Sequence, residues 1–447
     1  MTEMRSTVRR IAGSVARQTI GRLPRGSSRL TSALAAEGGV PVRNLRYRPW
    51  PRAQSTTLAQ WLTSVGPEFR RIFLSGAEGL PQTRQKQFAA EWARRCGCRH
   101  GLMLPHGTDA LRIALAAVFD HDGLAYGGEV IVPNLSFIAS ATAALDRRFG
   151  VAFVDVDPGT LNIDPARVEE AIVPGKTNAI MPVHQFGQPA DMTALQRIAR
   201  AHGLKIIEDA AQAHGAEWES GPAGSLGDAA AFSFQSAKNL ACGEGGVLIT
   251  NDHVVFDRAY SLHNAGRSRA LEARWEHVAL GWNIRATEYQ AALLLDRLDR
   301  FDDQQRVRAA NFDRLRHALR DVQCVTPLTV HPAVRRHGMY MFVMRYVAAE
   351  CNGLPLERFL RDLNAEGIPL TRCYASTMSA QVAMQDLLRR RPEYVRVLPT
   401  PVADRAAEEI VYLPANVFLA DGQDVDDISH AIWKVQQHHR RRSPAAS

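Results

Sequence analysis

The stretch 232-FSFQSAKNLACGEGGVLIT-250 places Lys238 in a bend of small residues between two segments with the composition of buried strands. A lysine in a loop is ordinarily a solvated surface charge. The apolar segments on both sides instead predict that Lys238 lies at the mouth of a sheet. Gly243, Gly245 and Gly246 allow the backbone to approach closely there.

A regular alternation of strands and helices surrounds this lysine. From Glu91 to about Asp252, short β-branched runs alternate with segments whose apolar residues recur at i, i+3, i+4 and i+7, which is the pattern of βαβ units. The predicted strands are HGLML at 100, EVIVP at 129, VAFVDVD at 151, AIMPVH at 179, LKIIEDA at 204, AAFSF at 230 and GVLIT at 246. The sequence therefore predicts an α/β domain with about seven mainly parallel strands between helices.

The chain divides into a large and a small predicted domain. Residues 51–304 form the large one, and a long helical stretch leads into a smaller C-terminal α/β domain at 305–440. Residues 441–447 are expected to be a frayed tail. Residues 1–50 carry ten Arg, no Lys and two acids, which accounts for the whole formal net charge of +8. We expect this basic stretch to be a disordered extension, with a transit peptide or a membrane-surface helix as alternatives.

Composition excludes several classes of protein. The residues after 50 are formally neutral, so the folded part offers no phosphate-tracking surface for nucleic acid. No stretch reaches the roughly 18–20 uncharged apolar residues of a membrane-spanning helix. Six Cys are too few for a disulfide scaffold, and the run CGCRH at 96–100 lacks the second ligand pair of a zinc site. We expect reduced thiols, no metal and a cytoplasmic location.

Polar residues follow several predicted strands, where ligands of open α/β sheets bind. Asp209 ends the strand at 204, with Gln212 close behind it. Gly107, Thr108 and Asp109 open a helix after the strand at 100, and such a turn presents backbone N–H groups and a positive dipole end to an anion. Taken singly, the acid would most often be a helix cap and the turn an ordinary capped helix.

Two further residues complete the set. Phe137 follows the strand at 129, where an aromatic is otherwise a core residue, and Ser233 lies near the end of the strand at 230. An aldehyde-bearing pyridinium phosphate needs a lysine for a Schiff base, a carboxylate on its ring nitrogen, an anion cradle and a flat stacking surface. All four are present in one predicted domain.

These segments together resemble one enzyme family. HGTDAL at 106, GGEVIVPNLSFIAS at 127, MPVHQFGQPADM at 181, IIEDAAQAHGA at 206, GDAAAFSFQSAKNL at 227 and LGWNIRATEYQAALL at 280 are similar, in order, to the DegT/DnrJ/StrS sugar aminotransferases. The resemblance runs from about residue 80 to 435. It implies the fold-type I architecture of pyridoxal-phosphate enzymes, with pyridoxal 5'-phosphate as cofactor and pyridoxamine 5'-phosphate during turnover.

The resemblance also implies a role for each residue. Lys238 matches the Schiff-base lysine, Asp209 the partner of the pyridine nitrogen and Gln212 the residue bonded to the ring oxygen. Phe137 matches the ring-stacking aromatic. The phosphate cradle is matched by Gly107, Thr108, Asp109 and Ser233. Asn283 matches an asparagine that reaches the phosphate from the neighbouring subunit, which implies a homodimer with shared active sites.

Two positions depart from the family pattern. His106 stands where Ser is common, and Gln235 stands where Tyr or His is frequent. Both could reshape substrate access.

The implied activity is an aminotransferase that moves an amino group from glutamate or glutamine to a keto sugar, usually nucleotide-linked, or to a keto-cyclitol. A dehydratase or aromatase of the aminohydroxybenzoate synthase type and a non-catalytic regulator of the same fold are the alternatives. The deoxysugar dehydratases of the family replace the lysine by His, so Lys238 argues against that branch.

Overall fold

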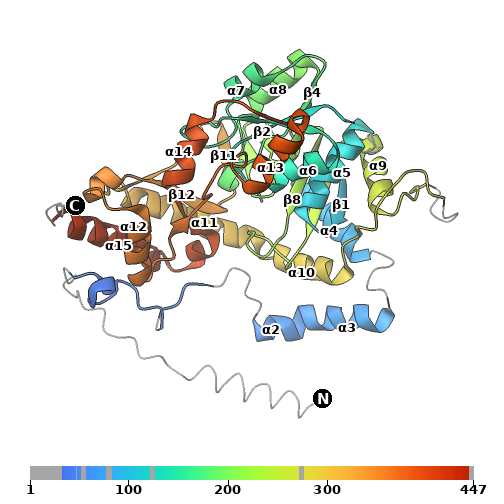
Figure 1. Cartoon of the computed structure of the whole chain (residues 1–447). Coiled ribbons are helices and arrows are strands. Elements are labelled where there is room, and N and C mark those ends of the chain that lie inside the picture. Colours follow the sequence, from blue (N-terminus) through green and yellow to red (C-terminus); the bar gives the residue numbers. More distant parts are fainter. Residues whose placement is uncertain are drawn as a thin grey trace, which may run out of the picture.

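The computed structural model describes residues 33–46, 48–51, 57–76, 83–120, 126–270 and 276–441. The predicted tail after residue 441 and the basic stretch before residue 33 lie outside the described residues. Figure 1 shows a large lobe, which contains β1, β2 and β8, and a smaller lobe, which contains α12 and α15. Helices α2 (Leu58–Gln60) and α3 (Gly66–Ser75) run along the edge of the large lobe.

The described residues form an eight-stranded sheet in the order β1-β9-β8-β5-β4-β2-β3-β14. β9 is antiparallel to both of its neighbours, and the other pairings are parallel. Its strands are β1 (His100–Leu104), β2 (Glu129–Pro133), β3 (Gly150–Val154), β4 (Thr177–Ile180), β5 (Lys205–Asp209), β8 (Ala229–Ser233), β9 (Gly246–Thr250) and β14 (Val395–Val397). The first seven confirm the sequence-predicted strands. Since most strands are parallel, their carboxyl ends meet at one edge of the sheet.

Helices cover both faces of this sheet, and their sequences explain their bounds. In α8, Met192, Leu195 and Ile198 form one buried stripe, the spacing of an amphipathic helix. Asp191 caps its start, and Gly203 ends it in a left-handed conformation. The larger helices of this lobe are α3 (Gly66–Ser75), α4 (Thr83–Arg95), α5 (Gly107–Phe119), α6 (Ala139–Asp146), α7 (Pro165–Ala171), α8 (Met192–His202), α9 (His253–His263) and α10 (Glu288–Leu298).

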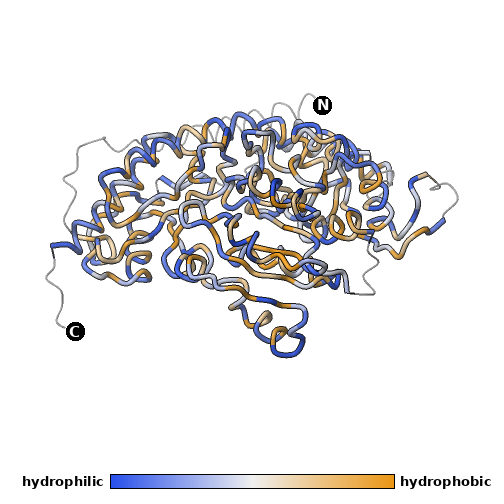
Figure 2. Tube along the Cα trace, turned by 90° about the horizontal axis from the view of Figure 1, so that it is seen from above, coloured by the Kyte–Doolittle hydropathy of each residue, from blue (hydrophilic) through white to orange (hydrophobic). Residues whose placement is uncertain are grey.

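The small lobe holds a four-stranded antiparallel sheet in the order β10-β12-β15-β13. Its elements are β10 (Val325–Pro327), β12 (Met341–Tyr346), β13 (Thr371–Arg372), β15 (Ile410–Pro414), α11 (Phe301–Ala318), α12 (Leu356–Ala365) and α15 (Gly422–Arg440). A three-stranded sheet in the order β11-β6-β7 pairs β6 (Glu217–Trp218) and β7 (Gly221–Pro222), which lie between β5 and β8 in the chain, with β11 (Val334–Arg336), which lies between β10 and β12. Figure 2 shows hydrophobic stretches mainly inside the molecule and hydrophilic stretches mainly along its outside.

The end of the predicted basic extension is folded, contrary to the expectation for residues 1–50. Leu34 is fully buried in the small-lobe core. Arg43 is 2% exposed and forms ion pairs with Asp424 and Asp427 at 3.1 and 3.0 Å. The Glu366 carboxylate accepts hydrogen bonds from the backbone of Ala35 and Val42, each at 2.9 Å. Residues 33–46 and 48–51 are therefore held on the small lobe.

Part of the predicted small domain belongs to the large lobe. β14 pairs in parallel with β3 as the edge strand of the large sheet. α13 (Val382–Arg390) precedes it, and Met378, Met384 and Val395 join the large-lobe core. The boundaries 305–440 are wrong for this segment, because the chain leaves the small lobe and returns to it through α14 (Pro401–Glu409).

Two sequence expectations concern the described residues directly. All six cysteines are unpaired. Within the described ranges, no helix has the length and hydrophobicity needed to cross a membrane.

Candidate active site

A cavity of about 740 Å³ opens at the carboxyl edge of the large sheet. Sites for small molecules usually have volumes of about 300–1,000 Å³. The cavity is lined by His106, Gly107, Thr108, Asp109 and Leu111; by Ser136, Phe137 and Ala139; by Asp209, Ala211 and Gln212; by Ser233, Gln235, Lys238 and Glu244; and by Tyr340, Met341 and Tyr374. The last three come from the small lobe, so both lobes enclose the cavity.

Lys238 lies in the loop that joins β8 to β9. Hydrogen bonds from Phe234 N to Gly245 O (2.8 Å) and from Ser236 N to Gly243 O (2.9 Å) hold the base of this loop. Gly243 has φ +96°, a conformation that favours glycine. The small residues of segment 232–250 thus allow the chain to turn and direct Lys238 into the cavity.

The Lys238 amine is set in a low-polarity environment. Its Nζ lies 3.3 Å from the Tyr340 hydroxyl and 4.4 Å from the centroid of the same ring. Burial lowers the pKa of Lys238 from 10.5 to about 8, while the negative charge of Asp209 acts in the opposite direction. The amine is therefore available as a neutral nucleophile near neutral pH.

Asp209 ends β5 and is 4% exposed. Its Oδ2 accepts a 2.7 Å hydrogen bond from the Ser140 hydroxyl, and its Oδ1 accepts one of 3.2 Å from the Ala211 backbone. Burial raises the pKa of Asp209, and these two hydrogen bonds and the charge on Lys238 oppose the rise. A cationic ring nitrogen bound beside this carboxylate would favour its ionised form.

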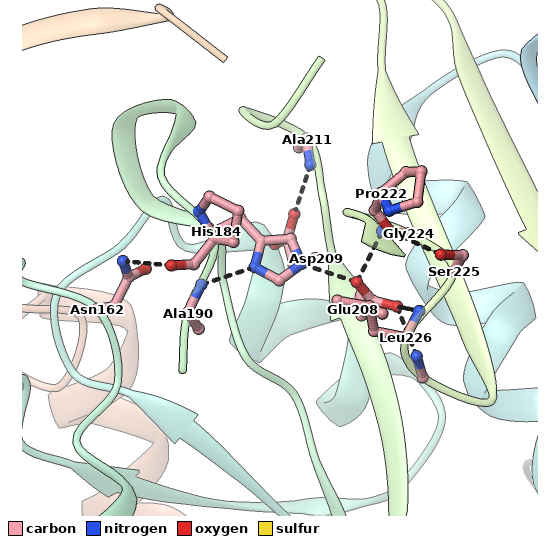
Figure 3. A network of polar contacts seen from close by, with 12 residues as sticks. Asn162, His184, Ala190, Glu208, Asp209, Ala211, Pro222, Gly224, Ser225 and Leu226 are labelled. Atoms are coloured by element: carbon pink, nitrogen blue, oxygen red, sulfur yellow. Dashed lines mark hydrogen bonds and ion pairs between the residues drawn. The ribbon is translucent and has the colours of Figure 1, made fainter. Parts of the chain in front are cut away.

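The neighbouring acid, Glu208, has a structural role (Figure 3). Successive side chains of a strand point to opposite faces, so Glu208 faces away from the cavity. It accepts hydrogen bonds from the backbone N–H groups of Gly224, Leu226 and Gly227 at 2.7, 2.7 and 2.6 Å.

His184 binds the same carboxylate. Its Nε2 lies 2.8 Å from Glu208 Oε2, and its Nδ1 accepts the Ala190 N–H, so Nε2 is the nitrogen that donates. The His184 backbone N–H donates to the Asp209 carbonyl at 3.1 Å. This network fixes the end of β5 and with it the position of Asp209.

The start of α5 forms an anion cradle. His106 is the N-cap residue, but its side chain makes no capping hydrogen bond, so the first backbone N–H groups of the helix face the cavity with a positive dipole end. A Cβ on Gly107 would lie 2.8 Å from Ser233 Cβ. This close approach brings the Ser233 hydroxyl beside those N–H groups. Asp109 contributes its backbone, because its carboxylate pairs with Arg112 at 2.9 Å.

Phe137 and Gln212 border the cavity from the segments that follow β2 and β5. The Phe137 side chain is 63% exposed, which leaves its ring free to stack on a flat ligand. The Gln212 amide is held by the Phe186 N–H, which donates to Oε1 (2.8 Å), and by the Tyr374 hydroxyl, which accepts from Nε2 (3.0 Å). An anion cradle, a buried acid, a buried amine and a stacking surface fit pyridoxal phosphate in one cavity.

Asn283 does not line this cavity in its own chain. It is an exposed residue that forms a β-bridge with Asn264 in the segment between α9 and α10. Within the described ranges, no cluster of three or more His, Cys, Asp or Glu side chains could hold a metal ion.

Eight lining residues of the cavity are not singled out by the sequence analysis, and four of them carry side chains that matter for the site: Tyr340, Met341, Tyr374 and Glu244. Tyr340, Met341 and Tyr374 belong to the small lobe, and single aromatic or apolar residues there have the pattern of core positions. Glu244 lies within the Gly-rich run 243–246, where the glycines dominate the pattern. Its charge between glycines was the one available signal.

Comparisons with known proteins agree with this geometry. A sequence model of the DegT/DnrJ/EryC1/StrS aminotransferase family matches residues 73–433. The chain is 36% identical to a putative L-glutamine:3-amino-2,3-dideoxy-scyllo-inosose aminotransferase of Streptoalloteichus tenebrarius, over 92% of this chain and 99% of that protein. It is 34% identical to the L-glutamine:scyllo-inosose aminotransferase of Streptomyces griseus, over 93% of this chain and 100% of that protein.

A solved structure shows the same fold. The crystal structure of 3-amino-5-hydroxybenzoic acid synthase superimposes with a TM-score of 0.75 at 29% identity and covers 88% of this chain and 99% of its own.

Proposed function

Because this chain belongs to the DegT/DnrJ/EryC1/StrS aminotransferase family, we propose that it uses pyridoxal phosphate to transfer the α-amino group of glutamine to a keto-cyclitol. The two curated relatives named above carry glutamine and an inosose ketone in their names. We therefore include glutamine as the amino donor and a keto-cyclitol as the acceptor in the proposal.

The charge of the cavity is the observation that carries the choice of acceptor. Among the described lining residues, the basic side chains are Lys238 and His106, and His106 lies 3.1 Å from Glu244. A nucleotide-linked sugar brings a diphosphate, which proteins bind with Arg, Lys or metal ions. An uncharged polyhydroxy ketone needs no such partner. The cavity therefore favours a keto-cyclitol over a nucleotide-linked keto sugar.

The cofactor would be held by the residues already described. The backbone at Gly107, Thr108 and Asp109, together with the Ser233 hydroxyl, would bind its phosphate, and Phe137 would stack on its ring. When bound, pyridoxal phosphate supplies an aldehyde that condenses with amines and a ring that withdraws electrons.

Three side chains then control protons. The Asp209 carboxylate holds a proton on the ring nitrogen, because a buried negative charge raises the pKa of a base beside it. Lys238 Nζ takes the proton from the donor α-carbon and returns it on the other side of the exchange. The Tyr340 hydroxyl at 3.3 Å orients that amine. A pKa of about 8 lets the Lys238 amine both accept and release protons near neutrality.

The two half-reactions balance in atoms. In the first, the C–N bond of glutamine is replaced by C=O, water supplies the oxygen, and the nitrogen stays on the enzyme. In the second, the ketone oxygen of the acceptor leaves as water and the nitrogen takes its place. Lys238 transfers the proton in both half-reactions, so one lysine is enough for the whole cycle.

We include a homodimer in the proposal. Asn283 is exposed and lies outside its own cavity, and Val278 and Leu280 in the same segment are 60% and 70% exposed. An asparagine so placed can serve a partner's phosphate site. Coexpression of Lys238→Ala with Asn283→Ala tests this: mixed dimers with one intact shared site should recover activity that neither variant has alone. Absence of recovery in purified mixed dimers would contradict shared sites. A cytoplasmic location, suggested by the unpaired cysteines, is also proposed.

Product analysis tests the activity itself. The protein, loaded with pyridoxal phosphate, is incubated with L-[α-¹⁵N]glutamine and either scyllo-inosose or 2-deoxy-scyllo-inosose, and the products are examined by mass spectrometry. We expect a ¹⁵N-labelled amino-cyclitol and 2-oxoglutaramate, and no product with Lys238→Ala. Loss of water from the acceptor without nitrogen transfer would support the dehydratase or aromatase alternative. A protein that binds the cofactor yet transfers nitrogen to no ketone tested would support the regulator.

A further inference from the structure

Two polar side chains at the active-site cavity have no part in the chemistry described so far. His106 and Glu244 both line the cavity, and their side chains are 51% and 52% exposed. His106 Nδ1 lies 3.1 Å from Glu244 Oε2, and because a carboxylate accepts, the ring nitrogen donates. The pair therefore presents a carboxylate to whatever enters the cavity.

The backbone around this pair is firmly placed. A Cβ on Gly246 would lie 2.2 Å from the His106 carbonyl oxygen, so β9 and the start of α5 are packed as closely as glycine allows. The Glu244 carbonyl accepts hydrogen bonds from Gln290 Nε2 at 2.6 Å and from Cys242 Sγ at 3.0 Å. The backbone of Glu244 is thus held by α10 and by its own loop, next to the close contact between β9 and α5.

The other charged side chains of the cavity are committed elsewhere. Asp109 pairs with Arg112, and Asp209 accepts from Ser140 and lies at the cofactor position. Lys238 is the reacting amine. Glu244 is therefore the carboxylate of the described lining that remains half exposed toward a substrate.

We propose that Glu244, positioned by His106, makes the enzyme select glutamine over glutamate as amino donor. This inference rests on the proposed function. The two donors differ at one end of the side chain: glutamine carries an amide with an N–H₂ donor, and glutamate carries a carboxylate with acceptors alone. The amide donates to Glu244, whereas the glutamate carboxylate meets a like charge.

The size of the effect follows from Coulomb's law. Two unit charges about 5 Å apart in a half-exposed setting interact with a strength that corresponds to roughly a tenfold change in an equilibrium constant. Replacing Glu244 by Gln raises the local charge by one, whatever the charge on His106. The preference for glutamine should then fall by about tenfold.

The test compares Glu244→Gln, Glu244→Asp and the wild-type enzyme, all loaded with pyridoxal phosphate. The first half-reaction is followed by stopped-flow absorbance of the cofactor with glutamine or glutamate alone, which separates donor selection from the acceptor. We expect the ratio of kcat/KM for glutamine over glutamate to fall about tenfold in Glu244→Gln. It should stay near the wild-type ratio in Glu244→Asp, which keeps the charge.

Binding without reaction gives a second readout. Glutaramate and glutarate have the two side-chain ends without an amino group, and their Kd values can be measured by calorimetry. Glu244→Gln should strengthen glutarate relative to glutaramate by a similar factor. Glu393→Gln is the matched control: Glu393 pairs with Arg391 at 2.6 Å next to β14, at the opposite edge of the sheet from β1, and should leave both ratios unchanged.

The outcomes separate the two proposals. A wild-type enzyme that transfers from glutamine but whose donor ratio is unchanged in Glu244→Gln, or is lost equally in Glu244→Asp, overturns the role of Glu244 alone. A wild-type enzyme that uses both donors equally overturns it as well. A protein that transfers nitrogen from neither donor refutes the proposed function instead. The Kd values of glutaramate and glutarate, measured by calorimetry on the folded variants, test the role of Glu244 even where turnover is slow.

Discussion

The amine of Lys238 should be substantially neutral near physiological pH. Burial lowers its pKa from 10.5 to about 8. At pH 7.5, a pKa of about 8 leaves roughly a quarter of the amine neutral, whereas an ordinary lysine would have about one part in a thousand neutral. The difference is about two orders of magnitude in reactive amine. This is the enhancement that the burial of Lys238 contributes before any cofactor is bound.

Competitive labelling measures this pKa in the cofactor-free protein. The protein is treated with acetic anhydride from pH 6 to 11, and acetylation of each lysine is quantified by mass spectrometry. The chain contains five lysines, and the exposed Lys205 serves as an internal reference for reagent loss. Because burial limits access, the midpoint of the pH profile is the relevant quantity, and it should lie near pH 8 for Lys238.

Substitution of Asp209 tests how its negative charge contributes to the pKa of Lys238. The negative charge of Asp209 favours the ammonium form of Lys238, so Asp209→Asn should lower the midpoint further, by roughly one unit. A wild-type midpoint near 10, or a midpoint that rises in Asp209→Asn, would refute the reasoning. The first result would mean that water reaches the amine freely. A midpoint that rises in Asp209→Asn would mean that the substitution reduces the burial of Lys238, and that this effect outweighs the loss of the carboxylate charge.

Three other substitutions have defined outcomes. Ser140→Ala removes the 2.7 Å hydrogen bond to Asp209, so the pKa of that acid should rise further and the acidic limb of the pH–rate profile should move to higher pH; an unmoved limb would contradict this. Gly107→Ala places a Cβ 2.8 Å from a neighbouring Cβ in the cradle, so equilibrium dialysis should show pyridoxal phosphate bound at least about tenfold more weakly, with no change in the control Gly159→Ala, where the nearest atom is 3.4 Å away. Glu366→Ala removes the carboxylate that pairs with the buried Lys434 and binds the backbone of the N-terminal segment, so the free energy of unfolding measured in urea should fall by about 3–5 kcal/mol. A fall below about 1 kcal/mol would show that the N-terminal segment does not depend on this carboxylate.

The sequence predicted those parts of the fold that have a local signal. The seven long strands of the large sheet are runs of β-branched and small residues between turn residues, and the structure contains all seven. β14 was missed because Val395–Val397 has three residues and an arginine at its centre, too short to show a period. It forms a strand because β3 offers an open edge.

The N-terminal segment was misread for a related reason. Its net charge and low hydrophobicity are those of a disordered chain. Its anchors, however, lie more than 300 residues away: Glu366 binds two of its backbone N–H groups, and Asp424 and Asp427 pair with Arg43. Charge composition cannot distinguish a solvated arginine from one whose partners come from the other end of the chain.

The candidate site divides in the same way. Glycine, threonine, serine, aspartate and lysine at the ends of strands follow from the geometry of the sheet, and the cavity brings Gly107, Asp209, Ser233 and Lys238 together. Tyr340 and Tyr374 could not be predicted, because their contacts with Lys238 and Gln212 depend on how the small lobe packs on the large one. Asn283 stays a prediction about a second subunit.

This division explains where selectivity resides. The residues proposed to bind the cofactor follow strands of one sheet, and their arrangement meets requirements that pyridoxal-phosphate aminotransferases share. The rest of the lining includes His106 and Glu244, which we propose select the donor, and Tyr340 and Tyr374 from the small lobe. Because the residues proposed for the cofactor must be kept for catalysis, we expect a change of donor or acceptor to involve substitutions among the remaining lining residues. Among these, Glu244 is the residue whose charge can be altered with the least effect on folding, because its side chain is half exposed.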